Sequence, residues 1–309
     1  MIIDRTGKIA EGIHMLGHHG FPIFLVDGER PAIVDGGLAF LGPIYVRQIH
    51  AVLGDRQPAW CFFTHAHFDH CSAVGYFKRS FPRMQVVASK KAADILSRPN
   101  AIHLIAQLNQ SALALSPLLG IDDTGVRFEP FGVDRIAEEG DCFELSSNLS
   151  LQVLETPGHT WDFLSYYVPE RRLLIASEAV GTREQRGHIM IDCLVDFDHY
   201  YQSIQRLKNL AVDILFQGHI YAFTGSDAQV HLDTSLDRSL RFKAMVKQFM
   251  RETGNDIQAV MQRFKAIEWE SNPGLRQPEP AYLLNLEARI KTVLRAIAAD
   301  AGKLYEKVH

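Results

Sequence analysis

The sequence predicts an α/β (α+β) body that is followed by an all-helical C-terminal extension. Up to about residue 230, short apolar runs typical of buried strands alternate with turn signals and helical stretches. After about residue 232, apolar residues recur at helical spacing instead. We therefore expect two parts, residues 1–231 and 232–309. The apolar stripes of the second part should pack against the first and cap its functional site.

In the first half, the turn signal DGERP separates two apolar runs and predicts a hairpin. The strands expected in this half cover residues 21–26, 32–35, 58–63 and 84–88. Val74, Phe77 and Phe81 lie at helical spacing, and a second helix is expected over 90–96. Residues 99–119 are rich in Ala, Leu and Gln, so we interpret them as a helical insertion.

In the second half, strands are expected over 126–131, 142–145, 149–155, 163–168, 172–176 and 212–216. A helix over 198–209 would take Asp198 as its N-cap. In the C-terminal part, Gly254 should close one helix, and Asn255 with Gln258 resembles a capping box for the next. Pro280 should open a last long helix.

Composition narrows the class of protein. The 309 residues are 47% apolar and 22% charged, which excludes a disordered chain. The net charge of −4 argues against a general nucleic-acid binder. The sequence contains no run of about 18 apolar residues, so no membrane span is expected. The N-terminus lacks the pattern of a secretory signal. Four scattered cysteines without a CxxC pattern indicate reduced thiols and a cytoplasmic protein. We expect a small-molecule substrate and allow for a homodimer.

The segment THAHFDH, residues 64–70, carries the strongest functional signal. His65 and His67 point to the same side of an extended segment, so they can share one cation. Asp69 and His70 lie where the chain turns into a helix and can reach a second cation. Imidazole and carboxylate groups suit zinc, iron or manganese. Two such ions roughly 3.5–4 Å apart would share a bridging hydroxide, which is a strong nucleophile at neutral pH.

This HxHxDH spacing resembles that of the metallo-β-lactamase superfamily, and the resemblance extends over about residues 12 to 225. The family's next ligand is a histidine in a Gly-His turn after a strand, which His159 in TPGHT matches. Its last ligand is a histidine at the end of a late strand, which His219 after VDILF matches. The resemblance implies a four-layer αββα sandwich with the metals at one edge of the sheets.

The family's remaining ligand is a bridging aspartate in a Gly-Asp pair after a strand, but this sequence has Ser177-Glu178 there. Glu178 either bridges both metals through its longer arm, binds one metal and leaves the other site weak, or marks a degenerate site. Asp192 or Asp196 would substitute if Glu178 does not reach. The implied ligands are His65, His67 and His159 for one metal, Asp69, His70 and His219 for the other, and Glu178 between them.

The resemblance implies a hydrolase with two divalent ions, zinc first and iron or manganese as alternatives. Asp69 is the expected catalytic residue, because it would hold the second metal and orient the hydroxide. Within the superfamily, the chain looks most like the PqsE-type and glyoxalase II-like thioesterase members, which have a helical C-terminal part. An ester or thioester substrate is therefore expected, with a lactone as a variant. Two other classes stay open: a ligand- or partner-binding regulatory protein and a phosphodiesterase.

Overall fold

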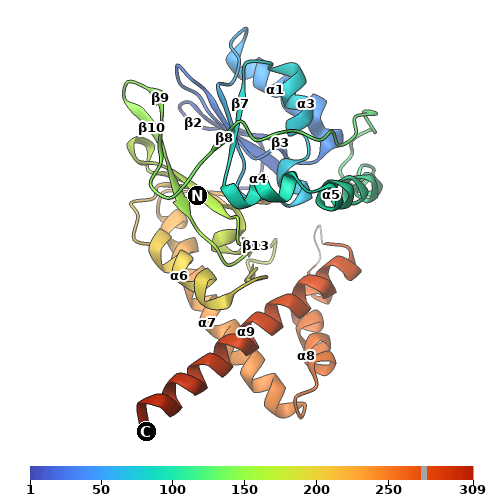
Figure 1. Cartoon of the computed structure of the whole chain (residues 1–309), viewed down its shortest axis with the longest axis vertical. Helices are drawn as coiled ribbons and strands as arrows, with labels where there is room; N and C mark the ends of the chain where they lie inside the picture. The colour runs from blue at the N-terminus through green and yellow to red at the C-terminus, as the bar shows by residue number, and fades with distance from the viewer. Residues whose placement is uncertain (273–276, 309) are drawn as a thin grey trace.

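The computed structural model describes residues 1–272 and 277–308, with side chains described up to residue 300. Two seven-stranded sheets face each other, and helices cover their outer faces (Figure 1). The strand orders are β2-β3-β4-β5-β6-β7-β8 in one sheet and β1-β16-β15-β12-β11-β10-β9 in the other. This is the mixed α/β, two-sheet architecture that the sequence predicted.

The first sheet is antiparallel at its start and parallel from β5 to β8. Its strands are β2 (Gly7–Ala10), β3 (Ile13–His18), β4 (Phe21–Val26), β5 (Ala32–Val34), β6 (Trp60–Phe62), β7 (Gln85–Ala88) and β8 (Arg135–Ile136). The helices between them are η1 (Ala39–Leu41), α1 (Gly42–Leu53), α2 (Phe68–Cys71), α3 (Val74–Ser80), α4 (Lys90–Leu96), α5 (Pro99–Ala112) and η2 (Leu113–Leu115).

The second sheet is mostly antiparallel, but β12 and β15 pair in parallel. Its strands are β1 (Ile2–Ile3), β9 (Cys142–Ser146), β10 (Leu149–Glu155), β11 (Leu164–Val168), β12 (Leu173–Ile175), β15 (Ile214–Phe216) and β16 (Ala222–Thr224). Between them lie η3 (Pro169–Arg171), η4 (Ser177–Val180), the hairpin β13 (Thr182–Arg183) with β14 (Ile189–Met190), and α6 (Phe197–Leu207).

Three apolar layers hold the sheets and helices together. Between the two sheets, Phe24 and Phe216 stack with ring centroids 4.3 Å apart. Outside the first sheet, Tyr45 and Phe77 pack with the apolar side of α5. Outside the second sheet, Leu207 packs with the start of α7. The burial of these alternating apolar residues accounts for the order of layers, helix–sheet–sheet–helix.

The C-terminal helices are α7 (Ser226–Glu252), α8 (Ile257–Phe264), the π-helical turn η5 (Lys265–Glu270) and α9 (Glu279–Val308). They form the elongated lower part of the molecule in Figure 1. Phe197, Tyr200 and Ile204 of α6 share one apolar cluster with residues of α7, α8 and α9. The expected packing of the helical stripes on the body is therefore present. The expected boundary at residue 231 lies inside α7, whose first turns belong to the body's own core.

Three sequence predictions were wrong in detail. Residues 126–131 form no strand, because Phe128 and Phe131 pack against the helical layer while β8 begins only at Arg135. The N-cap of α6 is Asp196, which is extended and accepts a hydrogen bond from the His199 amide, so Asp198 lies inside the helix.

The α8 cap is also displaced by one residue. Asp256 accepts hydrogen bonds from the amides of Gln258 and Ala259. Asn255 has a φ of 67° and belongs to the turn that ends α7.

Among the residues that the structure describes, no helix combines the length and apolar character needed to cross a bilayer.

A buried ion pair joins η5 to α9. Arg289 is 0% exposed and donates two hydrogen bonds of 2.9 Å to the Glu268 carboxylate, which also accepts one from the Tyr282 hydroxyl. Burial raises the pKa of Glu268, but the Arg289 guanidinium outweighs it and holds that pKa at about 2. The geometry of the pair offsets the free-energy cost of removing both charges from water, because each charge has hydrogen-bond partners in the interior.

Removal of this carboxylate charge is expected to destabilise the fold. Glu268→Gln leaves the Arg289 cation buried without its counter-charge, and we expect a loss of about 3–5 kcal/mol in the free energy of unfolding. Glu287→Gln, which breaks an exposed pair with Lys291 on the same helix, should cost less than about 1 kcal/mol. Denaturant titration of both variants measures the difference, and equal losses would contradict the assigned role of the pair.

The same pair makes stability depend on pH. Because the pKa of Glu268 is lowered from 4.5, its contribution is full above pH 4.5 and is lost as the pH falls toward 2. Wild type should therefore lose more stability than Glu268→Gln over that range. Parallel slopes of unfolding free energy against pH would show that this carboxylate is not coupled to folding.

Candidate metal centre

The seven residues expected as metal ligands meet at one edge of the two sheets. His65 and His67 follow β6, and Asp69 and His70 lie on the short helix α2. His159 lies in the loop between β10 and β11. The remaining two, Glu178 and His219, follow β12 and β15, which run in parallel and so end at the same edge. Residues up to 154 positions apart in the sequence therefore face one another, as His65 and His219 illustrate.

The first group of donors is His65, His67 and His159, whose ligand atoms all lie within 4.8 Å of one another. The His65 and His67 rings are 4.4 Å apart, as expected for residues on one side of an extended segment. His159 Nε2 lies 3.3 Å from His67 Nδ1. Burial lowers the pKa of all three imidazoles, that of His67 to about 4. The group is therefore neutral at pH 7, which is the form that binds a metal.

The second group is Asp69, His70 and His219, again with ligand atoms within 4.8 Å of one another. His219 Nε2 lies 3.7 Å from an Asp69 oxygen. The side chains of Asp69 and His219 are each one-fifth exposed, so both reach toward solvent. The mixture of imidazole and carboxylate suits zinc, iron and manganese alike.

Glu178 lies between the groups. Its Oε1 is 2.9 Å from Nε2 of His70 and 2.9 Å from Nε2 of His219. His65, His70 and Glu178 form a third set of ligand atoms within 4.8 Å, so this carboxylate also approaches His65 of the first group. Its Oε2 accepts a hydrogen bond from the Ser177 hydroxyl at 2.7 Å. One carboxylate oxygen is thus anchored and the other is directed at the centre.

Two small residues explain how glutamate fits where a shorter aspartate is expected. A Cβ on Gly218 would lie 2.4 Å from Glu178 Oε1 and 2.6 Å from Ser177 Oγ, so only glycine leaves this space free. Ser177 has a φ of 47°, the left-handed region that glycine adopts most easily. The backbone turn is therefore kept, and the longer side chain uses the space beside Gly218.

The turn that carries Glu178 is held from outside by two helices. Tyr200 of α6 donates a hydrogen bond to the backbone oxygen of Glu178 at 3.0 Å. His231 and Ser235 of α7 both donate to the backbone oxygen of Val180. The start of the C-terminal helices thus fixes the position of this carboxylate.

Outer hydrogen bonds set the tautomers of the histidines. His65 Nδ1 lies 3.0 Å from the Thr64 hydroxyl, which itself donates to Asp35. His70 Nδ1 donates to the other oxygen of the Asp35 carboxylate at 3.0 Å. With Nδ1 engaged, Nε2 of each ring is left for the centre. His65 Nε2 is buried and has no hydrogen-bond partner among the described residues, as a metal ligand would require.

The same arrangement recurs in the other half of the centre. His159 Nδ1 donates to the backbone oxygen of Asp192, and His219 Nδ1 to that of Gly20, each at 2.7 Å. A carbonyl oxygen can only accept, so both rings carry hydrogen on Nδ1 and present Nε2 inward. Four of the five imidazoles are therefore oriented before any cation arrives.

The charges of the second group are balanced around Glu178. Burial lowers the pKa of His70 and of His219, but the Glu178 carboxylate outweighs it and raises both. Burial likewise raises the pKa of Glu178, but His70 and His219 hold it well below its usual range. The carboxylate is therefore ionised and needs positive charge beside it, which a divalent cation supplies. The residues present thus fit the metals that the resemblance implies.

Two supporting residues were missed by the sequence analysis. Asp35 is 1% exposed, and besides His70 and the Thr64 hydroxyl it binds the Thr64 amide at 2.8 Å. Asp162 accepts a hydrogen bond from the Ala66 amide at 2.8 Å. Both fix the loop that carries His65 and His67. For Asp35 the sequence signal is its place at the end of an apolar run, in AIVDGG, whereas Asp162 in GHTWD follows no such run.

The alternative ligands have other roles. The Asp192 carboxylate accepts a hydrogen bond from Thr182, and only its backbone oxygen reaches His159. Asp196 caps α6. Cys71 is buried, and burial raises the pKa of its thiol well above the usual value, as expected for a packed side chain.

Comparison with known proteins gives the class. The family model described as the metallo-beta-lactamase superfamily matches residues 18–219, a span that includes all seven candidate ligands. The chain belongs to this superfamily.

Particular relatives are more distant. A hydroxyacylglutathione hydrolase from Rhizobium meliloti (strain 1021) is 29% identical over 153 residues, which cover 48% of this chain and 55% of that enzyme. The chain thus spans little more than half the length of this curated relative. Two solved structures share the fold at 15% identity. They are an archaeal superfamily protein from Sulfolobus tokodaii (TM-score 0.60, 92% and 98% of the two chains) and a beta-lactamase domain protein from Burkholderia ambifaria (0.66, 96% and 89%).

The geometry predicts how metal content responds to Glu178. Wild type should bind two equivalents of zinc or manganese, and Glu178→Ala should lose one of them, because His70 and His219 lose their shared anionic partner. Gly218→Ala should have a similar effect by displacing the same carboxylate. Metal analysis after dialysis measures both. Asp196→Asn is the matched control and should keep two equivalents; full loading of Glu178→Ala would contradict a ligand role.

Proposed function

We propose that the chain is a metal-dependent hydrolase of esters or thioesters. The observation that carries this proposal is the position of the Glu178 carboxylate between two three-donor groups, beside a cavity that His67 lines. The similarity to a hydroxyacylglutathione hydrolase supports a thioester in particular. The four free cysteines agree with the expected cytoplasmic setting. The cavity that His67 lines has the size expected for a small-molecule substrate.

The site would hold two divalent cations, with zinc favoured. One would bind His65, His67 and His159, the other Asp69, His70 and His219, and Glu178 would lie between them. When bound, they would polarise the substrate carbonyl and lower the pKa of a water molecule toward 7. Hydrolysis itself adds water across the C–S or C–O bond: the acid product keeps the hydroxyl group, and the thiol or alcohol leaves with the proton.

The chain's own residues have distinct parts in this scheme. Asp69 is partly exposed and lies 3.7 Å from His219, so it is the carboxylate placed to orient the water and take its proton. Glu178 holds its position through Ser177 and does not face solvent. Asp35 orients His70 and Thr64 and acts as a positioning residue.

A substrate panel tests the reaction. Metal-loaded protein is offered p-nitrophenyl esters, acyl thioesters, a lactone and bis(p-nitrophenyl) phosphate, and we expect turnover of thioesters or esters above that of the phosphodiester. His67→Ala should lose metal and activity together, since it removes a ligand without a change in the strand. Turnover of only the phosphodiester, or of none of the substrates by fully loaded protein, would refute the proposal.

The role of Asp69 has a separate test. Asp69→Asn keeps an oxygen ligand but cannot take a proton, so kcat should fall about 10²–10⁴-fold with a smaller change in KM. The kinetics are compared at equal metal content. A variant with unchanged kcat would assign proton transfer to another group.

A further inference from the structure

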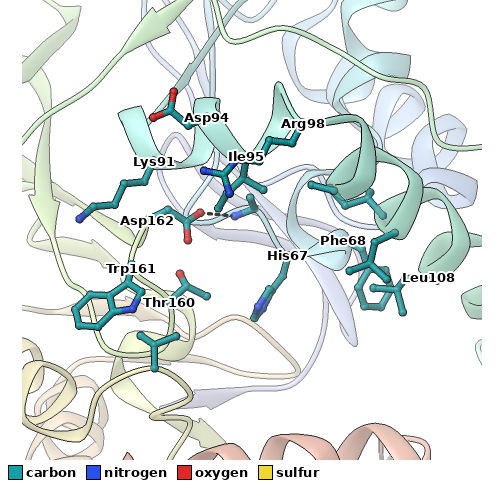
Figure 2. Close-up of a pocket in the computed structure, with 15 residues that line it drawn as sticks. His67, Phe68, Lys91, Asp94, Ile95, Arg98, Leu108, Thr160, Trp161 and Asp162 are labelled. Atoms are coloured by element: carbon teal, nitrogen blue, oxygen red, sulfur yellow. Dashed lines mark hydrogen bonds between the residues drawn. The ribbon is translucent and has the colours of Figure 1, made fainter.

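A cavity of about 490 Å³ opens beside His67 and is not explained by metal binding. Its lining comes from α2, α4, α5, the segment after His159, and Val195. In Figure 2, His67 lies between the side chains of α4, the pair Phe68 and Leu108, and the pair Thr160 and Trp161. A volume of this size is typical of small-molecule sites.

One side of the cavity is apolar and partly exposed. Leu104 is 54% exposed, Leu108 38% and Trp161 46%. Exposure of such apolar side chains to water is unfavourable. They surround the cavity with Phe68 and Ile105 rather than being scattered over the surface. Contiguous apolar surface beside a polar centre is typical of a ligand site.

The helix α5 that carries the two leucines is fixed to the metal loop. The buried Asn109 side chain donates to the Ser72 hydroxyl and to the backbone oxygen of Ile105, and it accepts from the Ala39 amide at 3.1 Å. Ser72 directly follows α2, which bears Asp69 and His70. The apolar wall thus keeps a set position relative to the candidate metal centre.

The α4 side of the cavity carries an excess of positive charge. Lys91 and Arg98 line it, and in the part of the chain that the structure describes neither forms an ion pair. Of the two acids of the lining, Asp94 pairs with Lys90 and Asp162 accepts a hydrogen bond from the Ala66 amide; with Lys90, three basic residues therefore stand against two acidic ones. Two unpaired cations at the rim of an apolar cavity favour an anionic group on the ligand.

We propose that this cavity selects amphiphilic substrates, namely esters or thioesters that carry both a medium-length apolar chain and a carboxylate or phosphate. The chain would lie along Leu104, Leu108 and Trp161, and the anion beside Lys91 and Arg98. This inference rests on the proposed function for the bond that is cleaved. Its recognition part stands on the cavity alone.

Binding of thioethers, which cannot be hydrolysed, tests recognition without catalysis. The probes are S-octyl and S-ethyl mercaptoacetate, and the matching uncharged mercaptoacetamides, added to metal-loaded protein. Trp161 fluorescence or calorimetry measures Kd. The octyl chain should bind at least about tenfold more tightly than ethyl, because it buries six more methylenes. The carboxylate should bind about tenfold more tightly than the amide.

Matched variants locate each effect. Leu104→Ser with Leu108→Ser should abolish the preference for octyl, whereas Leu240→Ser, a change at an exposed leucine of α7, should keep it. Lys91→Gln with Arg98→Gln should abolish the preference for the carboxylate. Lys247→Gln with Arg251→Gln removes the same charge from the surface of α7 and should leave that preference intact.

The outcomes separate this inference from the proposed function. Thioester turnover without chain-length or charge preference would overturn the inference and leave the proposed function standing. The predicted binding pattern without turnover would support the inference and refute the hydrolase. A carboxylate preference that survives loss of Lys91 and Arg98 would mean that the probe binds the metals directly, and would overturn the assignment of the cations.

Discussion

The Glu178 carboxylate is the interaction on which the rest of this centre depends. It lies 2.9 Å from both His70 and His219. Against the opposing effect of burial, the two histidines lower the pKa of the carboxylate, and the carboxylate raises the pKa of both histidines. Its position is set by the left-handed turn at Ser177 and by the space that Gly218 leaves open. A buried carboxylate of this kind is costly unless cations surround it, so the site is built to be completed by metal.

Preorganisation extends outward from this carboxylate. Hydrogen bonds on Nδ1 fix the imidazoles through Asp35, Asp192 and Gly20, which come from three distant segments of the chain. Two helices hold the turn of Glu178, and α7 among them begins the C-terminal extension. The helical part therefore supports the centre itself, and its first turns cannot be removed without releasing that support.

His65, His67, Asp69 and His70 stand out in the sequence because their spacing is local, and a strand, a turn and a helix present them in order. His159 and His219 lie far along the chain and were expected only from the resemblance to the superfamily. Most strands were found for the same reason, since alternation and turn residues are local signals. The strand over 126–131 failed because its phenylalanines pack on helices instead of pairing at a sheet edge. Local pattern does not distinguish these two ways of burying an apolar side chain.

Other features arise only when distant segments meet. The fit of Glu178 depends on Gly218, forty residues later, and no pattern near either residue indicates that contact. Asp35 looks like an ordinary turn aspartate until the fold brings it to His70. Likewise, Leu104 and Leu108 belonged to a predicted helical insertion, but only the fold shows that they and Trp161 line one cavity.

The central claim is that two cations bind on either side of Glu178. Anomalous scattering from crystals of the metal-loaded protein, collected at the absorption edge of the bound metal, tests it most directly. The account predicts two peaks roughly 3.5–4 Å apart, one among His65, His67 and His159 and one among Asp69, His70 and His219, with Glu178 Oε1 in contact with at least one. A single peak remote from Glu178, or none in fully loaded protein, would contradict it.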